Sequence, residues 1–192
     1  MAPLMVGMAI TAPVFVRLLL TEKWLPCVPY VRIFCVTYLF YPIHTANLNA
    51  IKAMGRSDLF LKMEIQKKII GIILLLSTMW FGVMAMAYSM LVSCAASQLI
   101  NSWPNRKLLN YSYGKQILDI VPSIALSLAM GAIVLLVPNA GWNDLVTLAV
   151  QVIVGGIFYV GGSAVFRLEP FVYLFSTVKQ MVSSKKGPKE AQ

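Results

Sequence analysis

The segment IIGIILLLSTMWFGVMAMAYSMLVSCAASQLINSWPN, residues 69–105, carries no charged side chain and decides the fold class. As a single helix it would be roughly 55 Å long at about 1.5 Å per residue. The hydrocarbon core of a bilayer is only about 30 Å thick. The segment must therefore fold back on itself, and Gly82, which follows Trp80 and Phe81, is the predicted turn. We expect a hairpin of two membrane-spanning helices.

The composition of the whole chain agrees with an integral membrane protein. Hydrophobic residues make up 59% of the sequence and charged residues 12%, and the mean hydropathy is +0.76, which is unusual for a soluble domain. The net charge of +9 comes mainly from basic residues in short connections between apolar segments. This placement is typical of membrane orientation rather than of a nucleic-acid groove, so we expect membrane lipid as a partner and no nucleic acid.

The apolar runs predict an all-α, polytopic transmembrane helix bundle of about six spans. An amphipathic segment, residues 59–68, is predicted to lead into the third span after a break at Gly55 and a cap from Ser57 or Asp58. A second amphipathic helix at the inner leaflet and a disordered basic tail are predicted after the last span. The predicted spans are about 3–20, 28–54, 65–81, 83–103, 116–137 and 145–166, with the interfacial helix at 167–182 and the tail at 183–192.

Lysine and arginine are distributed unevenly between the connections, which predicts the orientation. The turn at Gly82 and the connection 138–143 carry none. The positive-inside rule places the basic connections and both ends of the chain in the cytoplasm. These basic residues are Lys52, Arg56, Lys62, Lys67 and Lys68 in the second connection, Arg106, Lys107 and Lys115 in the fourth, and Arg167, Lys179, Lys185, Lys186 and Lys189 in the tail.

The second span contains the polar residues of greatest chemical interest. At about 100° per residue they lie on or beside one arc of a helix, near Pro42, which can free a backbone carbonyl. Polar groups inside a membrane face a bundle interior or a wet cavity. One interpretation is that this face lines a hydrophilic pathway and contacts a polar substrate; the other is that its side chains hydrogen-bond to a neighbouring helix. The candidate substrate-contacting residues are His44, Thr45, Asn47, Asn49 and Lys52.

Other polar residues have simpler interpretations. Asp119 is a candidate proton-coupling residue, although an ion pair with Lys115 one turn earlier also accounts for it. Gln98 and Asn101 are attributed to hydration at the membrane interface, and Gln151 to a hydrogen bond between helices. No catalytic residue, metal ligand or cofactor-binding residue is predicted. His44 has no second histidine or suitably spaced acid beside it, and the three cysteines, Cys27, Cys35 and Cys94, lack metal-type spacing.

Glycines recur in the last predicted span, where they allow neighbouring helices to approach closely. Packing is the favoured interpretation, and bending during a transport cycle is the alternative. The residues concerned are Gly155, Gly156, Gly161, Gly162 and Ser163.

Three motifs give the chain a family resemblance. They are Pro3-Leu4-Met5 at the start of the first span, Leu19 to Trp24 (LLTEKW) in the turn that follows, and the stretch from Asn49 to Asp58 (NAIKAMGRSD). With a downstream pair of hairpins, these features resemble the C-terminal part of bacterial lipopolysaccharide or capsular polysaccharide biosynthesis flippases. Those proteins form part of the multidrug/oligosaccharidyl-lipid/polysaccharide exporter superfamily.

The resemblance implies a transporter in the bacterial cytoplasmic (inner) membrane. Its cargo would be an undecaprenyl-pyrophosphate-linked oligosaccharide, moved by alternating access and without a catalysed reaction, metal or cofactor. Such transporters have two helical lobes and twelve to fourteen spans, so about six spans correspond to one lobe. We therefore expect the chain to be a fragment or a truncated product, whose partner is a missing N-terminal lobe or a second copy of itself.

Two alternatives remain open from the sequence. The chain could be a membrane scaffold or a truncated remnant that transports nothing. It could also be a membrane-bound glycan ligase or acyltransferase, although one histidine and scarcely any intramembrane acid fit such an enzyme poorly.

Overall fold

The computed structural model describes residues 1–108, 113–136 and 143–166, and every regular element in these ranges is helical. Two short 3-10 helices, η1 (Glu22–Cys27) and η2 (Met79–Phe81), connect longer α-helices. The α-helices are α1 (Ala2–Leu20), α2 (Val28–Leu39), α3 (Tyr41–Ala53), α4 (Ser57–Thr78), α5 (Val83–Leu108), α6 (Tyr113–Leu136) and α7 (Asp144–Val165). The predicted interfacial helix at 167–182 and the tail at 183–192 lie outside the described residues.

The structure confirms an all-α polytopic membrane bundle. Within the described residues, five helical segments are long and apolar enough to cross a bilayer, namely α1, Glu22–Ala53, Val83–Pro104, Gly114–Leu136 and α7. The predicted third span, 65–81, corresponds to the second half of α4 followed by η2. The predicted amphipathic segment 59–68 belongs to the same helix. Its charged residues and the apolar residues that follow them therefore lie on one continuous helix, α4.

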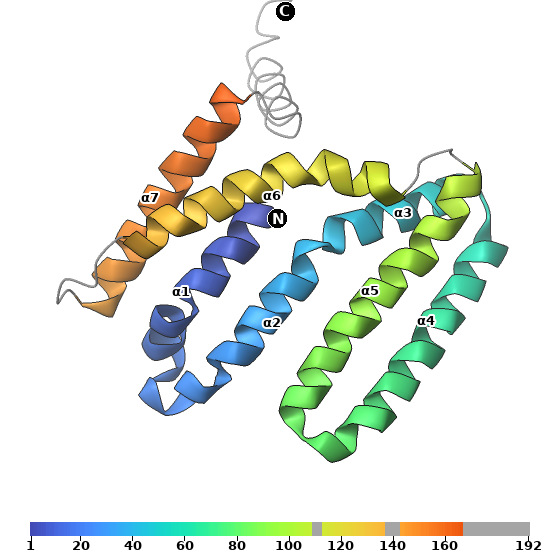
Figure 1. Cartoon of the computed structure of the whole chain (residues 1–192), viewed down its shortest axis with the longest axis horizontal. Helices are drawn as coiled ribbons and strands as arrows, with labels where there is room; N and C mark the ends of the chain where they lie inside the picture. The colour runs from blue at the N-terminus through green and yellow to red at the C-terminus, as the bar shows by residue number, and fades with distance from the viewer. Residues whose placement is uncertain (109–112, 137–142, 167–192) are drawn as a thin grey trace, which may run out of the picture.

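The helices form two groups that α2 and α3 join (Figure 1). In the first group, α1 packs against α2, α6 and α7, and α6 also packs against α7. In the second group, α4 and α5 form an antiparallel hairpin, and α5 packs against α2 and α3. The turns at η1 and η2 lie at the same end of the molecule, whereas the α3–α4 connection lies at the opposite end (Figure 1). Arg17 at the end of α1 pairs with Asp144 at the start of α7, 3.2 Å apart, which places these two helix ends together.

Two glycines in left-handed conformations make the predicted chain reversals, and both predictions are confirmed. Gly82 has φ +91 and separates η2 from α5, and Gly55 has φ +68 and separates α3 from α4. Residues with a Cβ rarely adopt these angles. The predicted cap of α4 is wrong: Arg56 is the N-cap residue and makes no side-chain capping bond, because the helix already begins at Ser57.

The second predicted span, 28–54, consists of two helices. α2 ends at Leu39 and α3 begins at Tyr41, and Phe40 between them has φ −91 and ψ 0. Pro42 lies in the first turn of α3, where its missing N–H does no harm. The proline therefore permits the break, which falls two residues before it.

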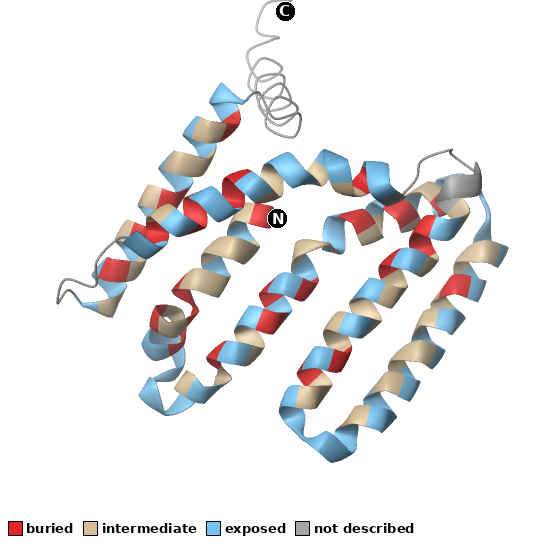
Figure 2. Cartoon of the chain, viewed as in Figure 1, coloured by how far each residue is buried: buried red, intermediate tan, exposed pale blue. Residues whose placement is uncertain are grey.

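Many large apolar residues are exposed, as lipid-facing residues of a membrane bundle are, and exposed positions occur along every helix (Figure 2). Close contacts between helices depend on glycine at two positions. A Cβ on Gly131 of α6 would lie 2.4 Å from Ile10 of α1, and a Cβ on Gly162 of α7 would lie 2.6 Å from Leu126 of α6. Gly156 and Gly161 have no such neighbour. Helix packing therefore accounts for Gly162 among the predicted small residues of the last span, but not for Gly156 and Gly161.

Candidate functional site

Buried polar side chains from three helices meet at the end of the bundle where α3 joins α4. We call this group the polar seam. Its members on α5 are almost fully buried, with Asn101 0% exposed and Gln98 2% exposed, whereas His44 is partly buried. The seam consists of His44 and Asn47 on α3, Gln98, Asn101 and Ser102 on α5, and Gln116 on α6.

Asn47 connects three helices through its side-chain amide. Its Nδ2 donates to Oε1 of Gln116 on α6 at 2.8 Å and to Oγ of Ser102 on α5 at 3.4 Å. The Ser102 hydroxyl also donates to Gln116 Oε1 at 3.5 Å. Asn47 itself is 4% exposed. Polar bonds of this kind hold helices together where lipid offers no alternative partner.

His44 lies one turn before Asn47 and bonds to α5. Its Nδ1 is 2.7 Å from Nδ2 of Asn101. A carboxamide nitrogen can only donate, so Nδ1 accepts and the neutral ring carries its proton on Nε2. The Tyr41 ring is stacked beside the imidazole, with 6.1 Å between ring centroids. One neighbour on each side thus fixes the orientation of His44.

The break between α2 and α3 is stabilised by α5. Breaking a helix leaves carbonyl groups of its last turn without intrahelical donors. Cys94 Sγ donates to the carbonyl of Thr37 at 3.5 Å. The Phe40 carbonyl oxygen accepts from the His44 backbone N–H at 3.4 Å and also from Gln98 Nε2 at 2.7 Å. These bonds explain how an interrupted helix is accommodated inside an apolar bundle.

A partly buried ion pair on α4 borders the seam. The Lys67 ammonium donates to Glu64, and the Lys67 side chain is only 9% exposed. Both residues lie close enough to His44 for electrostatic interaction. The seam therefore contains one titratable ring facing one positive and one negative side chain.

The structure separates the five predicted substrate-contacting residues. His44 and Asn47 turn inward and bond to neighbouring helices, and the Thr45 hydroxyl donates to the carbonyl of Tyr41 at 3.1 Å. Asn49 and Lys52 are exposed, and Lys52 Nζ lies 4.6 Å from the centroid of the Phe60 ring. Two of the five thus bond to neighbouring helices and two are exposed, and the contact of the five residues with a substrate remains a prediction.

The prediction of interface hydration for Gln98 and Asn101 is wrong, because both are buried against α3. The sequence analysis also missed Ser102 and Gln116. A usable signal exists in the spacing: Gln98 and Asn101 are three residues apart, as are His44 and Asn47, so each pair presents two polar groups on one helix face.

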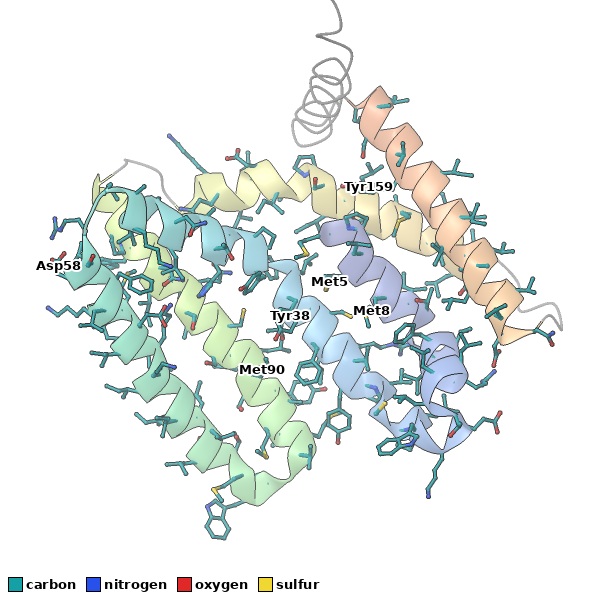
Figure 3. The ribbon with its side chains drawn as sticks, turned by 180° about the vertical axis from the view of Figure 1, so that it is seen from behind. Met5, Met8, Tyr38, Asp58, Met90 and Tyr159 are labelled. Atoms are coloured by element: carbon teal, nitrogen blue, oxygen red, sulfur yellow. The ribbon has the colours of Figure 1, made fainter. Side chains whose placement is uncertain are left out.

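Asp119 and Gln151 lie away from the seam. Asp119 is exposed on α6, and its role in proton coupling remains a prediction. Gln151 is 8% exposed, and its Oε1 finds no hydrogen-bond partner among the described residues. Gln151 borders an apolar groove of about 480 Å³ between α1, α6 and α7, whose lining includes Met5, Met8 and Tyr159 (Figure 3).

The stretch Gly55 to Asp58, which carries part of the family resemblance, forms a turn with an ion pair. Arg56 Nε donates to Asp58 Oδ1 at 3.1 Å, and Arg56 Nη2 donates to Oδ2 at 3.2 Å. The hydrogen bonds from Arg56 lower the pKa of the Asp58 carboxyl, and the same bonds raise the pKa of Arg56. Asp58 lies at the outer edge of the molecule, away from the seam (Figure 3).

None of the described His, Cys, Asp and Glu side chains gather in a group of three that could hold a metal ion.

Comparison with known proteins gives one informative relative. A membrane protein of Klebsiella pneumoniae, described as an uncharacterized membrane protein in the cps region, is 26% identical over 164 residues. The match covers 82% of this chain and 33% of the relative, so the chain spans about a third of the relative's length. No known family model matches, and no solved structure does. This is a multi-pass membrane protein. The five apolar helical segments and the membrane relative both support that statement.

Proposed function

We propose that the chain is part of a flippase that moves lipid-linked oligosaccharides across the bacterial inner membrane for cell-surface polysaccharide biosynthesis. The observation that carries this proposal is the relative in a cps region, that is, a capsular polysaccharide region, which matches most of the chain. A sugar chain on a pyrophosphate cannot cross hydrocarbon unaided, because burying its charged and polar groups is very costly. A polytopic bundle encoded for such a pathway fits the task of carrying it across.

The interrupted helices support a bundle that changes conformation. Alternating access requires elements that have two arrangements, and broken transmembrane helices are a common source of them. Here α2 and α3 are separated at Phe40, and three further helices contain an internal proline, at Pro13, Pro104 and Pro122. Each proline removes one backbone hydrogen bond and weakens the helix locally.

The proposal assigns two groups of residues on α3 different roles. Asn49 and Lys52 are exposed near the end of α3 and are available to contact a polar, anionic headgroup. His44 and Asn47 hold α3 against α5 and α6 and would transmit movement of α3. The same proposal has three further parts. The substrate is linked to undecaprenyl pyrophosphate, a second lobe is supplied by more chain or by another copy, and no reaction is catalysed.

Point variants in the cell that makes the protein can separate transport from the alternatives. We would replace Gly131 by Leu, which disrupts the α1–α6 contact, and compare it with Gly161→Leu, where no side chain lies within 4 Å. Lipid-linked oligosaccharides would be extracted from inside-out and right-side-out membrane vesicles after lectin labelling. The vesicle type that is labelled shows which leaflet holds the glycan.

A flippase predicts that Gly131→Leu accumulates complete oligosaccharide units on the cytoplasmic leaflet, while Gly161→Leu behaves as wild type. An enzyme of glycan assembly predicts instead that the accumulated units lack a sugar or an acyl group. A non-transporting scaffold or remnant predicts complete units in the normal distribution between leaflets. Either of the last two results would overturn the proposal.

A further inference from the structure

Only one of the two polar atoms of the Asn101 carboxamide has a hydrogen-bond partner in the polar seam. Its Nδ2 faces Nδ1 of His44 at 2.7 Å, whereas its Oδ1 is buried and has no hydrogen-bond partner within the described part of the chain. Asn101 is 0% exposed. Leaving a buried carbonyl oxygen without a donor is costly, so such an atom in a well-packed seam needs an explanation.

The neighbouring ring can provide a donor if it gains a proton. Neutral His44 accepts at Nδ1, but protonated His44 carries N–H groups at both nitrogens. A half-turn of the Asn101 carboxamide about its Cβ–Cγ bond would then place Oδ1 where Nδ2 now lies. The bond between Nδ1 and Asn101 would persist with its direction reversed. The oxygen and nitrogen of a carboxamide are nearly equal in size, so the turn exchanges their positions without changing the volume of the side chain, and Nδ2 takes the place that Oδ1 leaves.

The charges that face His44 come from α4 and from its own helix. Glu64 and Lys67 on α4 are within electrostatic reach, the first favouring a positive ring and the second opposing it. On α3 itself, the Tyr41 ring is stacked against the imidazole and Lys52 lies two turns further on. The described titratable side chains of α5 are Tyr88, more than three turns from Asn101, and Cys94, which bonds to the Thr37 carbonyl.

We propose that His44 is a proton-binding site. When the His44 ring gains a proton, the carboxamide of Asn101 on α5 reverses its orientation. The step forms one N–H bond at Nδ1 and breaks one O–H bond of a hydronium ion, which is left as water; no other covalent bond changes. His44 is the single histidine of the chain. The binding site stands on the seam alone; its use to drive transport rests on the proposed function. In that setting His44, rather than exposed Asp119, would carry the coupled proton.

NMR of the full chain in lipid nanodiscs tests the proposal directly, because selective ¹⁵N-histidine labelling gives signals from one ring. A second sample carries ¹⁵N in the side-chain amides of Asn and Gln. We expect Nδ1 to be the unprotonated nitrogen at high pH, and the ring to gain a proton on Nδ1 as the pH falls. The Asn101 amide signals should shift with the same midpoint. Gln98, one turn earlier, also has a buried oxygen without a partner among the described residues, but its Nε2 donates to the Phe40 carbonyl rather than to the ring. It is therefore the internal control and should not follow.

Two variants make the result independent of the amide assignments. Asn101→Leu removes the carboxamide and should abolish the hydrogen-bond shift of His44 Nδ1 at high pH, whereas Gln98→Leu should leave it unchanged. The proposal is overturned if Nδ1 carries the proton at high pH, if the ring does not titrate between about pH 4 and 9, or if the Asn101 signals ignore its titration. These readouts contain no transport step, so their failure leaves the flippase proposal intact, and a failed transport experiment leaves the proton site intact.

Discussion

Arg32 on α2 donates a hydrogen bond from Nε to the carbonyl oxygen of Ala9 on α1, at 3.1 Å. Ala9 lies four residues before Pro13, which has no N–H to give to that carbonyl. An arginine from the neighbouring helix thus supplies the donor that the proline removes. An ionisable residue in a membrane span is usually read as a substrate or ion ligand, but here it has a structural partner.

This relationship predicts that Arg32 contributes to the free energy of unfolding only while Pro13 is present. Arg32→Leu should lower the free energy of unfolding by about 1 kcal/mol, because the Ala9 carbonyl loses its donor. Pro13→Ala restores a backbone donor within α1, so in that background Arg32→Leu should cost much less. A double-mutant cycle in mixed micelles measures the coupling between the two sites. Equal costs of Arg32→Leu in both backgrounds would show that the arginine does not serve this carbonyl.

The buried amide of Asn47 and the exposed amide of Asn49 form a natural comparison two residues apart. Asn47→Ala should reduce the free energy of unfolding by about 1–3 kcal/mol, since Gln116 and Ser102 lose a buried partner. Asn49→Ala should change it by less than about 0.5 kcal/mol. Chemical unfolding followed by circular dichroism would give both values. Similar values for the two variants would contradict the seam described above.

Gly131 and Gly161 test the close helix contacts. A Cβ at Gly131 would lie 2.4 Å from Cδ1 of Ile10 and 3.0 Å from Cγ1 of Val6, so a leucine there requires these side chains of α1 to move. We expect a loss of about 1–3 kcal/mol from overpacking. Gly161→Leu adds a side chain on an open surface and should be neutral or slightly stabilising, because leucine favours a helix more than glycine does. Thermal unfolding of the two purified variants is the measurement.

The Arg56–Asp58 pair predicts a contribution to stability that depends on pH. The hydrogen bonds from Arg56 lower the pKa of Asp58 in the folded protein, so the pair stabilises the fold above the ordinary pKa of an aspartate. That contribution is lost as the pH falls through the lowered pKa. Arg56→Gln should therefore flatten the pH dependence of unfolding between about pH 2 and 5. An NMR titration of Asp58 gives the shift itself, and an Asp58 pKa that Arg56→Gln does not raise would exclude the interaction.

The sequence predicts the local features of this fold well. Gly82 and Gly55 mark chain reversals because their left-handed backbone suits glycine, and charge-free runs mark the helices. Pro42 signals a disturbance of the second span, although the break occurs at Phe40. Such features depend on neighbours in the sequence, which can be read directly.

The partners of polar residues could not be predicted in the same way. The helical arc of His44 and Asn47 shows that they share a face, but it does not show which helix covers that face or in what register. Asn101 and Gln116 lie 57 and 69 residues away from their partners on α3. The donor from Arg32 to Ala9 likewise depends on how two helices cross. These contacts follow from tertiary packing, for which a single sequence carries no separate signal.

The composition of α4 has a consequence for the order in which the chain enters the bilayer. All five of its charged residues lie in its first twelve positions, and α4 is not among the helices apolar enough to cross on their own. During synthesis Ser57–Thr78 emerges from the ribosome before α5, which begins at Val83. Its amphipathic first half suits the lipid surface, and its apolar second half gains a protein neighbour only when α5 follows around Gly82. The hairpin is therefore a unit of biogenesis: α4 depends on a later segment of the nascent chain for its place in the membrane.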